Sequence, residues 1–217
     1  MDLWKIYNVK WLFLTKLCGS VPGDPEMVKK WLDARQPKVR PASSKSIVEV
    51  QEEVFATLNE ETVEQSILTF QRVDGALVMR AATVRAHMKD CARVLSAQYI
   101  GKIKGERSFS TRIINGVYPD ELQYWIPILR IDGTPVTAPD GTMDKAVHVR
   151  GIRGEPLNSL KTFEFVNGAR MDFRLKILGK SASNDDLETL FTYGGVHGYA
   201  GERGDGEGKY SFTLDAE

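Results

Sequence analysis

The sequence predicts an α+β fold in which helices cover one face of an antiparallel sheet. Three patterns lead to this prediction. Residues 170–178 alternate apolar and charged side chains, as a half-buried strand requires. Residues 82–98 repeat apolar side chains at the spacing of an amphipathic helix. Asp74-Gly75 separates two apolar runs, which is typical of the turn in a β-hairpin.

The first third of the chain indicates a strand followed by an inserted lobe. Residues 5–19 are rich in aliphatic and aromatic side chains and end at a glycine, which favours a long, buried first strand. Asp24 and Pro25 are the residue types preferred at a helix N-cap and at the first helical position. The acidic segment 49–64 also has helical spacing. We therefore predict a partly helical inserted lobe at about 24–65.

The middle of the chain begins with the hairpin and the helix at 82–98. Val84, Met88, Cys91 and Leu95 form the apolar face of that helix. From about residue 99 the pattern changes to strands and loops, with two further Asp-Gly turn signals. We therefore expect a β-rich insertion at about 101–160.

The last part of the chain contains a strand at 170–178, a short helix capped by Ser183 or Asn184, a glycine-rich stretch and a final aromatic strand. Short helices thus alternate with antiparallel-type strands along the whole sequence. This order fits a βαββαβ core of the ferredoxin-like or RRM-like kind, with helices on one face of the sheet. We expect one domain over 1–217 that carries the two insertions.

Composition restricts the function classes. The 217 residues include 29 Lys and Arg and 29 Asp and Glu, so any nucleic-acid footprint must be local. Cys18 and Cys91 fall on apolar faces and are expected in the core. The cysteines and the three separated histidines lack metal-ligand spacing, so we expect no metal and no cofactor. The short, lysine-interrupted apolar run near residue 12 predicts no membrane span and a cytoplasmic protein.

Seven glycines lie within residues 193–208, directly before the last strand. A phosphate-binding P-loop is excluded, because Tyr210 follows Gly208-Lys209 where Ser or Thr is required. A dinucleotide-binding fingerprint is excluded because the stretch follows a helix and opens a strand. We attribute the Arg-Gly-Asp tripeptide at 203–205 to chance. Two interpretations stay open: a tight turn without a ligand, or backbone that lies close to a phosphate chain.

The helix, the glycine-rich stretch and the aromatic strand together resemble the C-terminal signature of the RAMP superfamily. These are ferredoxin-like RNA-binding proteins that build CRISPR effector backbones. The matching residues are Gly198, Gly201, Arg203, Gly204, Gly206, Gly208, Lys209 and Tyr210. Residues 12–22 and 73–95 are similar in placement to the family's first strand and to its lysine-bearing helix. Residues 80–86 depart from the family pattern, since its glycines are missing and Arg85 stands where lysine is usual.

The resemblance implies a non-catalytic RNA-binding subunit of a CRISPR-type ribonucleoprotein in antiviral defence. Its implied partners are guide or other single-stranded RNA, copies of itself and other effector subunits. The candidate RNA-binding residues are Arg85, Lys89, Arg93, Lys102, Lys104, Arg107, Arg150, Arg153, Gly198, Gly201, Arg203, Gly204 and Lys209. Each basic cluster is equally well explained as a solvated charged face. The candidates for base stacking are Trp31, Tyr99, Phe109, Tyr199 and Tyr210, although most aromatic side chains in proteins belong to the core.

Two alternatives remain from the sequence. Some RAMP relatives cleave RNA with a histidine or with an acidic residue and a metal ion, which makes His197 and Asp24 candidate catalytic residues. Asp24 is also explained as an N-cap, and the sequence places no acid or base beside His197. We therefore expect no catalysis. The other alternative is a phage or mobile-element protein that uses the fold for assembly without RNA.

Overall fold

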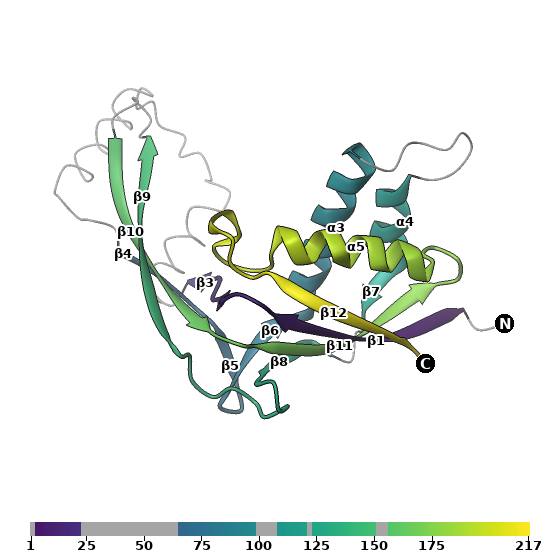
Figure 1. Ribbon diagram of the computed structural model, residues 1–217, viewed down its shortest axis with the longest axis horizontal. Helices are drawn as coiled ribbons and strands as arrows, with labels where there is room; N and C mark the ends of the chain where they lie inside the picture. Colours follow the sequence, from purple (N-terminus) through teal and green to yellow (C-terminus); the bar gives the residue numbers. More distant parts are fainter. Residues whose placement is uncertain (1–2, 23–64, 99–107, 121–122, 151–155) are drawn as a thin grey trace, which may run out of the picture. The chain divides into compact units, whose positions relative to one another are not determined.

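The computed structural model describes residues 3–22, 65–98, 108–120, 123–150 and 156–217 (Figure 1). The chain divides into two compact units. Unit 1 comprises Met1–Val21, Thr69–Thr142 and Phe163–Glu217, and unit 2 comprises Pro22–Leu68 and Met143–Thr162. Nearly all of the predicted lobe at 24–65 lies outside the described residues, and the predicted boundaries of both insertions stay predictions.

Unit 1 is built on a seven-stranded sheet. Its strands are β1 (Trp4–Phe13), β5 (Gln71–Val73), β6 (Ala76–Arg80), β7 (Val117–Pro119), β8 (Trp125–Leu129), β11 (Arg170–Leu178) and β12 (Tyr210–Ala216). Their order is β12-β1-β11-β8-β6-β5, with β7 also paired to β11. Neighbouring strands are antiparallel. Counting β1, β8, β11 and β12 as the first to fourth core strands, the order is fourth, first, third, second. This arrangement confirms the predicted ferredoxin-like α+β fold, extended by the β5–β6 hairpin.

Three α-helices are found in the described part of the chain: α3 (Ala81–Gln98), α4 (Phe109–Gly116) and α5 (Asn184–His197). They lie on one face of the sheet (Figure 1). Helix α3 confirms the helix predicted at 82–98. Ser183 caps α5: its side chain accepts a hydrogen bond from the Asp186 N–H, while the Asp186 carboxylate accepts one from the Ser183 N–H. This reciprocal capping explains where the helix starts.

Helix α4 corrects one expectation, because the pattern after residue 99 predicts strands and loops. Ser108 caps the helix by accepting a hydrogen bond from the Thr111 N–H at 3.3 Å. Phe109, Ile113 and Gly116 are buried, at the spacing of one helix face. The isoleucines and threonine of this segment are residues that also favour strands, so they obscure its helical period.

The core of unit 1 is centred on Trp11 of β1, whose side chain is fully buried. Its indole stacks on the Tyr210 ring at 4.2 Å and meets Phe173 edge-on at 4.9 Å. The rings of His87 and Phe191 contact it from α3 and α5. Aromatic pairs of this kind each add about 1 kcal/mol beyond the area that they bury. One side chain therefore joins β1 to its two neighbouring strands and to both long helices.

A second sheet contains β2 (Leu17–Cys18), β3 (Val21–Pro22), β4 (Gln65–Thr69), β9 (Gly141–Arg150) and β10 (Pro156–Val166). Its order is β2-β10-β4-β3, with β9 paired to β10. Cys18 and Cys91 are buried, as predicted, and form no disulfide with each other. None of the described helices is long and apolar enough to cross a membrane.

Candidate nucleic-acid interface

The glycine-rich stretch is packed tightly against the protein's own backbone and core. Gly198 ends α5 with φ 83°, and a Cβ at this position would collide with the Glu207 carbonyl oxygen. Gly208 has φ 72°, and a Cβ there would collide with the Tyr199 carbonyl oxygen. A side chain at either position would be strained by the positive φ and would not fit at so close an approach, so glycine is required. Most of the glycines therefore have a structural reason that needs no ligand.

The second half of the glycine-rich stretch is fixed to the segment that follows β1. The Gly208 N–H donates to the Lys16 carbonyl at 2.9 Å, and the Lys16 N–H donates to the Glu207 carboxylate at 2.8 Å. The Lys209 N–H donates to the Thr15 hydroxyl at 2.9 Å. These bonds join positions about 190 residues apart in the chain. The exposed 3-10 turn at Arg203–Asp205 is thus held by an anchored loop.

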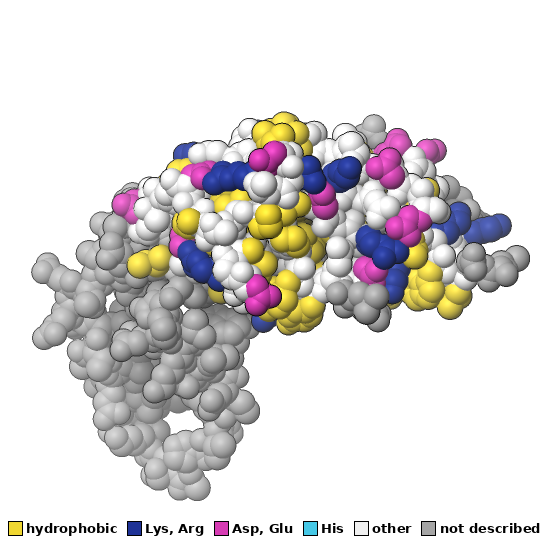
Figure 2. All heavy atoms as spheres, turned by 90° about the horizontal axis from the view of Figure 1, so that it is seen from below, with side chains coloured by type: hydrophobic (Ala, Val, Ile, Leu, Met, Phe, Trp, Pro, Cys, Tyr) yellow, Lys and Arg dark blue, Asp and Glu magenta, His cyan; other side chains and the backbone are white. Residues whose placement is uncertain are grey.

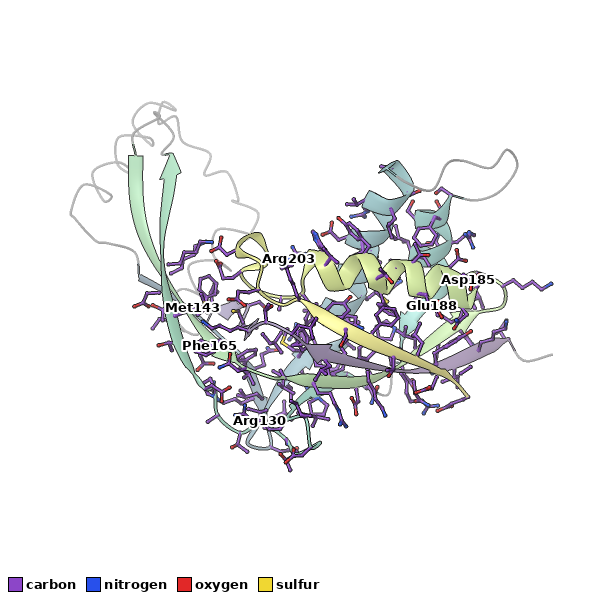
Figure 3. The ribbon with its side chains drawn as sticks, in the orientation of Figure 1. Arg130, Met143, Phe165, Asp185, Glu188 and Arg203 are labelled. Carbon is purple, nitrogen blue, oxygen red and sulfur yellow. The ribbon has the colours of Figure 1, made fainter. Side chains whose placement is uncertain are left out.

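A pocket of about 330 Å³ lies between α3 and this loop. Its lining includes Thr83, His87, Asp90, Arg93, Tyr199 and Arg203. Figure 3 labels Arg203 on the loop near the C-terminal end of α5. Arg93 and Arg203 were predicted separately, one from the helix stripe and one from the loop signature. The structure brings both predicted cations to one cavity.

The basic stripe of α3 does not stay on one side of the helix. Each four-residue step from Arg85 to Lys89 to Arg93 turns the side chain about 40° beyond a full turn. Arg85 consequently faces β7 and α4. Its guanidinium lies 4.3 Å from the ring centre of Tyr118 in β7 and donates to the Ile114 carbonyl of α4 at 3.5 Å. Arg93 is exposed and faces the pocket. Arg85 therefore contributes to packing beside the helix, whereas Arg93 contributes to the cavity.

Arg203 belongs to a small polar cluster at the rim of the pocket. Its guanidinium lies 3.4 Å from the Asp90 carboxylate and 3.2 Å from Nε2 of His197. The same imidazole nitrogen lies 3.5 Å from Asp90, and its ring stacks on Tyr193 at 5.5 Å. Asp90 therefore orients both side chains. Asp90 was not predicted as a site residue, because a lone aspartate on a helix carries no recognisable pattern.

The inner wall of the pocket is uncharged. His87 is 4% exposed, and its Nε2 lies 3.0 Å from the Tyr210 hydroxyl. Burial lowers the pKa of His87 to about 3, with smaller contributions from the nearby His197 and Arg203. The Thr83 hydroxyl donates to the Arg80 carbonyl at 2.7 Å, so the buried Tyr199 hydroxyl donates to Thr83. The polar groups of this wall are thus already paired, and the charged side chains of the pocket lining are Asp90, Arg93 and Arg203.

The sheet face turned away from the helices is a poorer phosphate site. Figure 2 shows this face, where Lys and Arg side chains lie beside Asp and Glu side chains around an apolar middle. Arg170 pairs with Asp172 at 2.6 Å, and Lys176 pairs with Asp120 at 2.9 Å. Paired cations gain less from a phosphate, because they must first give up a carboxylate.

The other predicted site residues are placed differently. Lys209 lies away from the two-arginine pocket and lines a separate groove, and Gly204 is exposed at the loop tip. Asp24, Lys102, Lys104, Arg107 and Arg153 lie outside the described residues, as does the side chain of Arg150. The stacking candidates Trp31 and Tyr99 also lie outside them. Phe109, Tyr199 and Tyr210 are at most 4% exposed and belong to the core, which favours the core alternative for these three stacking candidates.

The comparison with solved structures agrees with this fold. The sequence matches no protein-family model and no curated protein. A chain of the cryo-electron-microscopy structure of the Type III-B Cmr-beta bound to cognate target RNA is similar over 98% of this chain, with TM-score 0.51 and 9% identity. This chain spans 60% of the length of that one. A chain of a Type IV-B CRISPR complex aligns over 97% of this chain and 90% of its own, with TM-score 0.47 and 9% identity. The first likeness shows that this chain shares its fold with part of that chain.

Proposed function

We propose that the chain is a non-catalytic RNA-binding subunit of a CRISPR-type ribonucleoprotein. In this proposal the pocket between α3 and the glycine-rich loop binds the backbone of guide or other single-stranded RNA. The observation that carries the proposal is the meeting of Arg93 and Arg203, from segments more than 100 residues apart, at one cavity. The RAMP-like loop sequence and the fold support the same conclusion.

The pocket's charges suit a phosphate group. Arg93 has no acidic partner among the described residues, so its guanidinium is available without breaking an ion pair. Arg203 shares Asp90 with His197 and is 39% exposed, so its donors are oriented and still reachable. Guanidinium groups bind phosphate oxygens in a bidentate manner. Contacts of this type position a strand without reading its sequence.

The Arg93→Ala variant is expected to bind RNA about tenfold more weakly at low salt, because one phosphate contact is lost. The slope of log Kd against log salt concentration should become shallower by about 0.7, the value for one contact to a single strand. Fluorescence anisotropy with a labelled single-stranded RNA over a salt series measures both quantities.

The matched control is Lys180→Ala, which removes one exposed positive charge from the turn before α5. That turn and the pocket lie at opposite ends of the helix, so RNA affinity should be nearly unchanged. Equal losses in both variants would mean that only the total charge matters. Unchanged binding by Arg93→Ala would remove the pocket from the RNA-binding surface.

The arrangement of His197 favours a binding role over catalysis. Its Nε2 is already within 3.5 Å of both Asp90 and Arg203, so it is not directed at the pocket as a free base. Denaturing electrophoresis of the same RNA after incubation with the protein should show intact strands. Cleavage that disappears in His197→Ala would instead support the endoribonuclease alternative.

A further inference from the structure

Strand β12 lies at one end of the seven-stranded sheet and pairs on one side with β1. The Leu14 N–H donates to the Lys209 carbonyl, and the Glu217 N–H donates to the Ile6 carbonyl. Hydrogen-bonded pairs alternate along an antiparallel ladder, so these two bonds define which residues face β1. Ser211, Thr213 and Asp215 must bond to β1. The N–H and C=O groups of Phe212 and Leu214 consequently point outward, away from the sheet.

A groove of about 380 Å³ runs beside the first half of β12, between this strand and α5. Buried Phe191 and partly buried Phe212 contribute apolar surface, and Val196 and Leu14 are exposed at 72% and 67%. Exposed apolar side chains next to unpaired strand backbone are a characteristic docking feature. Such a groove accepts side chains that project from an added strand on the helix side of the sheet.

The sequence of β12 is complementary to itself. Its positive charge, Lys209, precedes the strand, and its negative charges, Asp215 and Glu217, are at the other end. Lys209 and Asp215 have no ion-pair partner among the described residues, and Glu217 pairs with Arg174 of its own chain at 2.9 Å. Two antiparallel copies of the strand would place each lysine beside the partner's acidic end.

We propose that β12 pairs with β12 of a second copy of this chain, forming a two-fold symmetric dimer with one continuous sheet. In the register that the geometry favours, Phe212 lies opposite the partner's Leu214, and Thr213 meets its own symmetry mate. Gly195 of α5 covers the outward carbonyl of Tyr210. The hydrogen bonds between the two copies are therefore centred on a later residue, Thr213. This register carries the partner's Leu214 and Ala216 toward the groove and sets Lys209 opposite the partner's Glu217.

The prediction is a concentration-dependent dimer in the micromolar range, measured by sedimentation velocity on RNA-free protein, because so short an interface is weak. Leu214→Pro removes an outward N–H while leaving the bonds to β1, and it should weaken dimerisation at least tenfold. A monomer at hundreds of micromolar concentration would overturn the proposal. The proposal is independent of RNA binding, since no RNA is present in this measurement.

Charge reversal tests the symmetric register without touching the strand backbone. Lys209→Glu and Glu217→Lys should each weaken the dimer, because each places like charges together at both ends. An equimolar mixture of the two variants should recover dimerisation, since both charge pairs become attractive in the mixed dimer. Lys180→Glu is the matched control and should dimerise like the wild type. Failure of the mixture to recover, with both variants folded by circular dichroism, would reject the register and the pairing that defines it.

Discussion

Replacing Gly208 with alanine is expected to lower the free energy of unfolding by about 3 kcal/mol. Gly208 has φ 72°, a conformation that costs an L-residue about 1–2 kcal/mol. The added Cβ would also collide with the backbone of Tyr199, which cannot move independently because its ring is packed against Trp11. Urea unfolding followed by tryptophan fluorescence measures the loss.

Gly204→Ala is the matched control in the same loop. Gly204 is exposed, lies outside the positive-φ region, and has open space where a Cβ would stand. The substitution should change the free energy of unfolding by less than about 0.5 kcal/mol. Equal losses in the two variants would contradict the view that steric fit fixes the glycine at 208. A stable Gly208→Ala protein would show that the loop can rearrange.

Local patterns in the sequence predict the strands and helices of the core better than they predict which strands pair with one another. The alternation in residues 170–178 appears in β11 as Met171, Phe173, Leu175 and Ile177, all buried. The helical period at 82–98 likewise became α3. The pairing of β1 with β12 joins Tyr7 to Ala216, and nothing in a local window specifies a contact across that separation. The order of strands could be guessed only from the βαββαβ arrangement.

The sequence predicts which basic residues are candidates for the site, but it does not predict which of them lie together in the structure. Spacing identified a basic stripe on α3, and the loop signature identified Arg203. Whether Arg85 or Arg93 faces the loop depends on the direction in which α3 packs against α4, which is a tertiary property. The sequence leaves the glycines open between tight turns and phosphate contacts, and most of them are explained by close packing that only the three-dimensional structure reveals.

The buried imidazole of His87 should make the fold sensitive to mild acid. Its pKa is lowered from 6.5 to about 3, mainly by burial and further by the charges of His197 and Arg203, with Asp90 acting in the opposite direction. Below pH 6.5 the unfolded chain binds a proton at this residue, while the folded protein does not until about pH 3. Unfolding therefore takes up a proton in this window, and stability falls as the pH falls.

The expected loss is about 1.4 kcal/mol per pH unit in the middle of that window. Between pH 6.5 and pH 4.5 it reaches roughly 2–3 kcal/mol, a large share of the stability of a typical domain. His87→Gln keeps a polar group near the Tyr210 hydroxyl and cannot bind the proton, so its free energy of unfolding should decline much less over this range. Urea unfolding of both proteins at several pH values measures the difference between them. Both proteins contain the same carboxylates, so the acid sensitivity that these groups cause cancels in that difference.

His197→Gln, which alters the more exposed imidazole of the same cluster, should retain most of the acid sensitivity. If His87→Gln loses stability with falling pH as steeply as the wild type, the buried imidazole is not the group responsible.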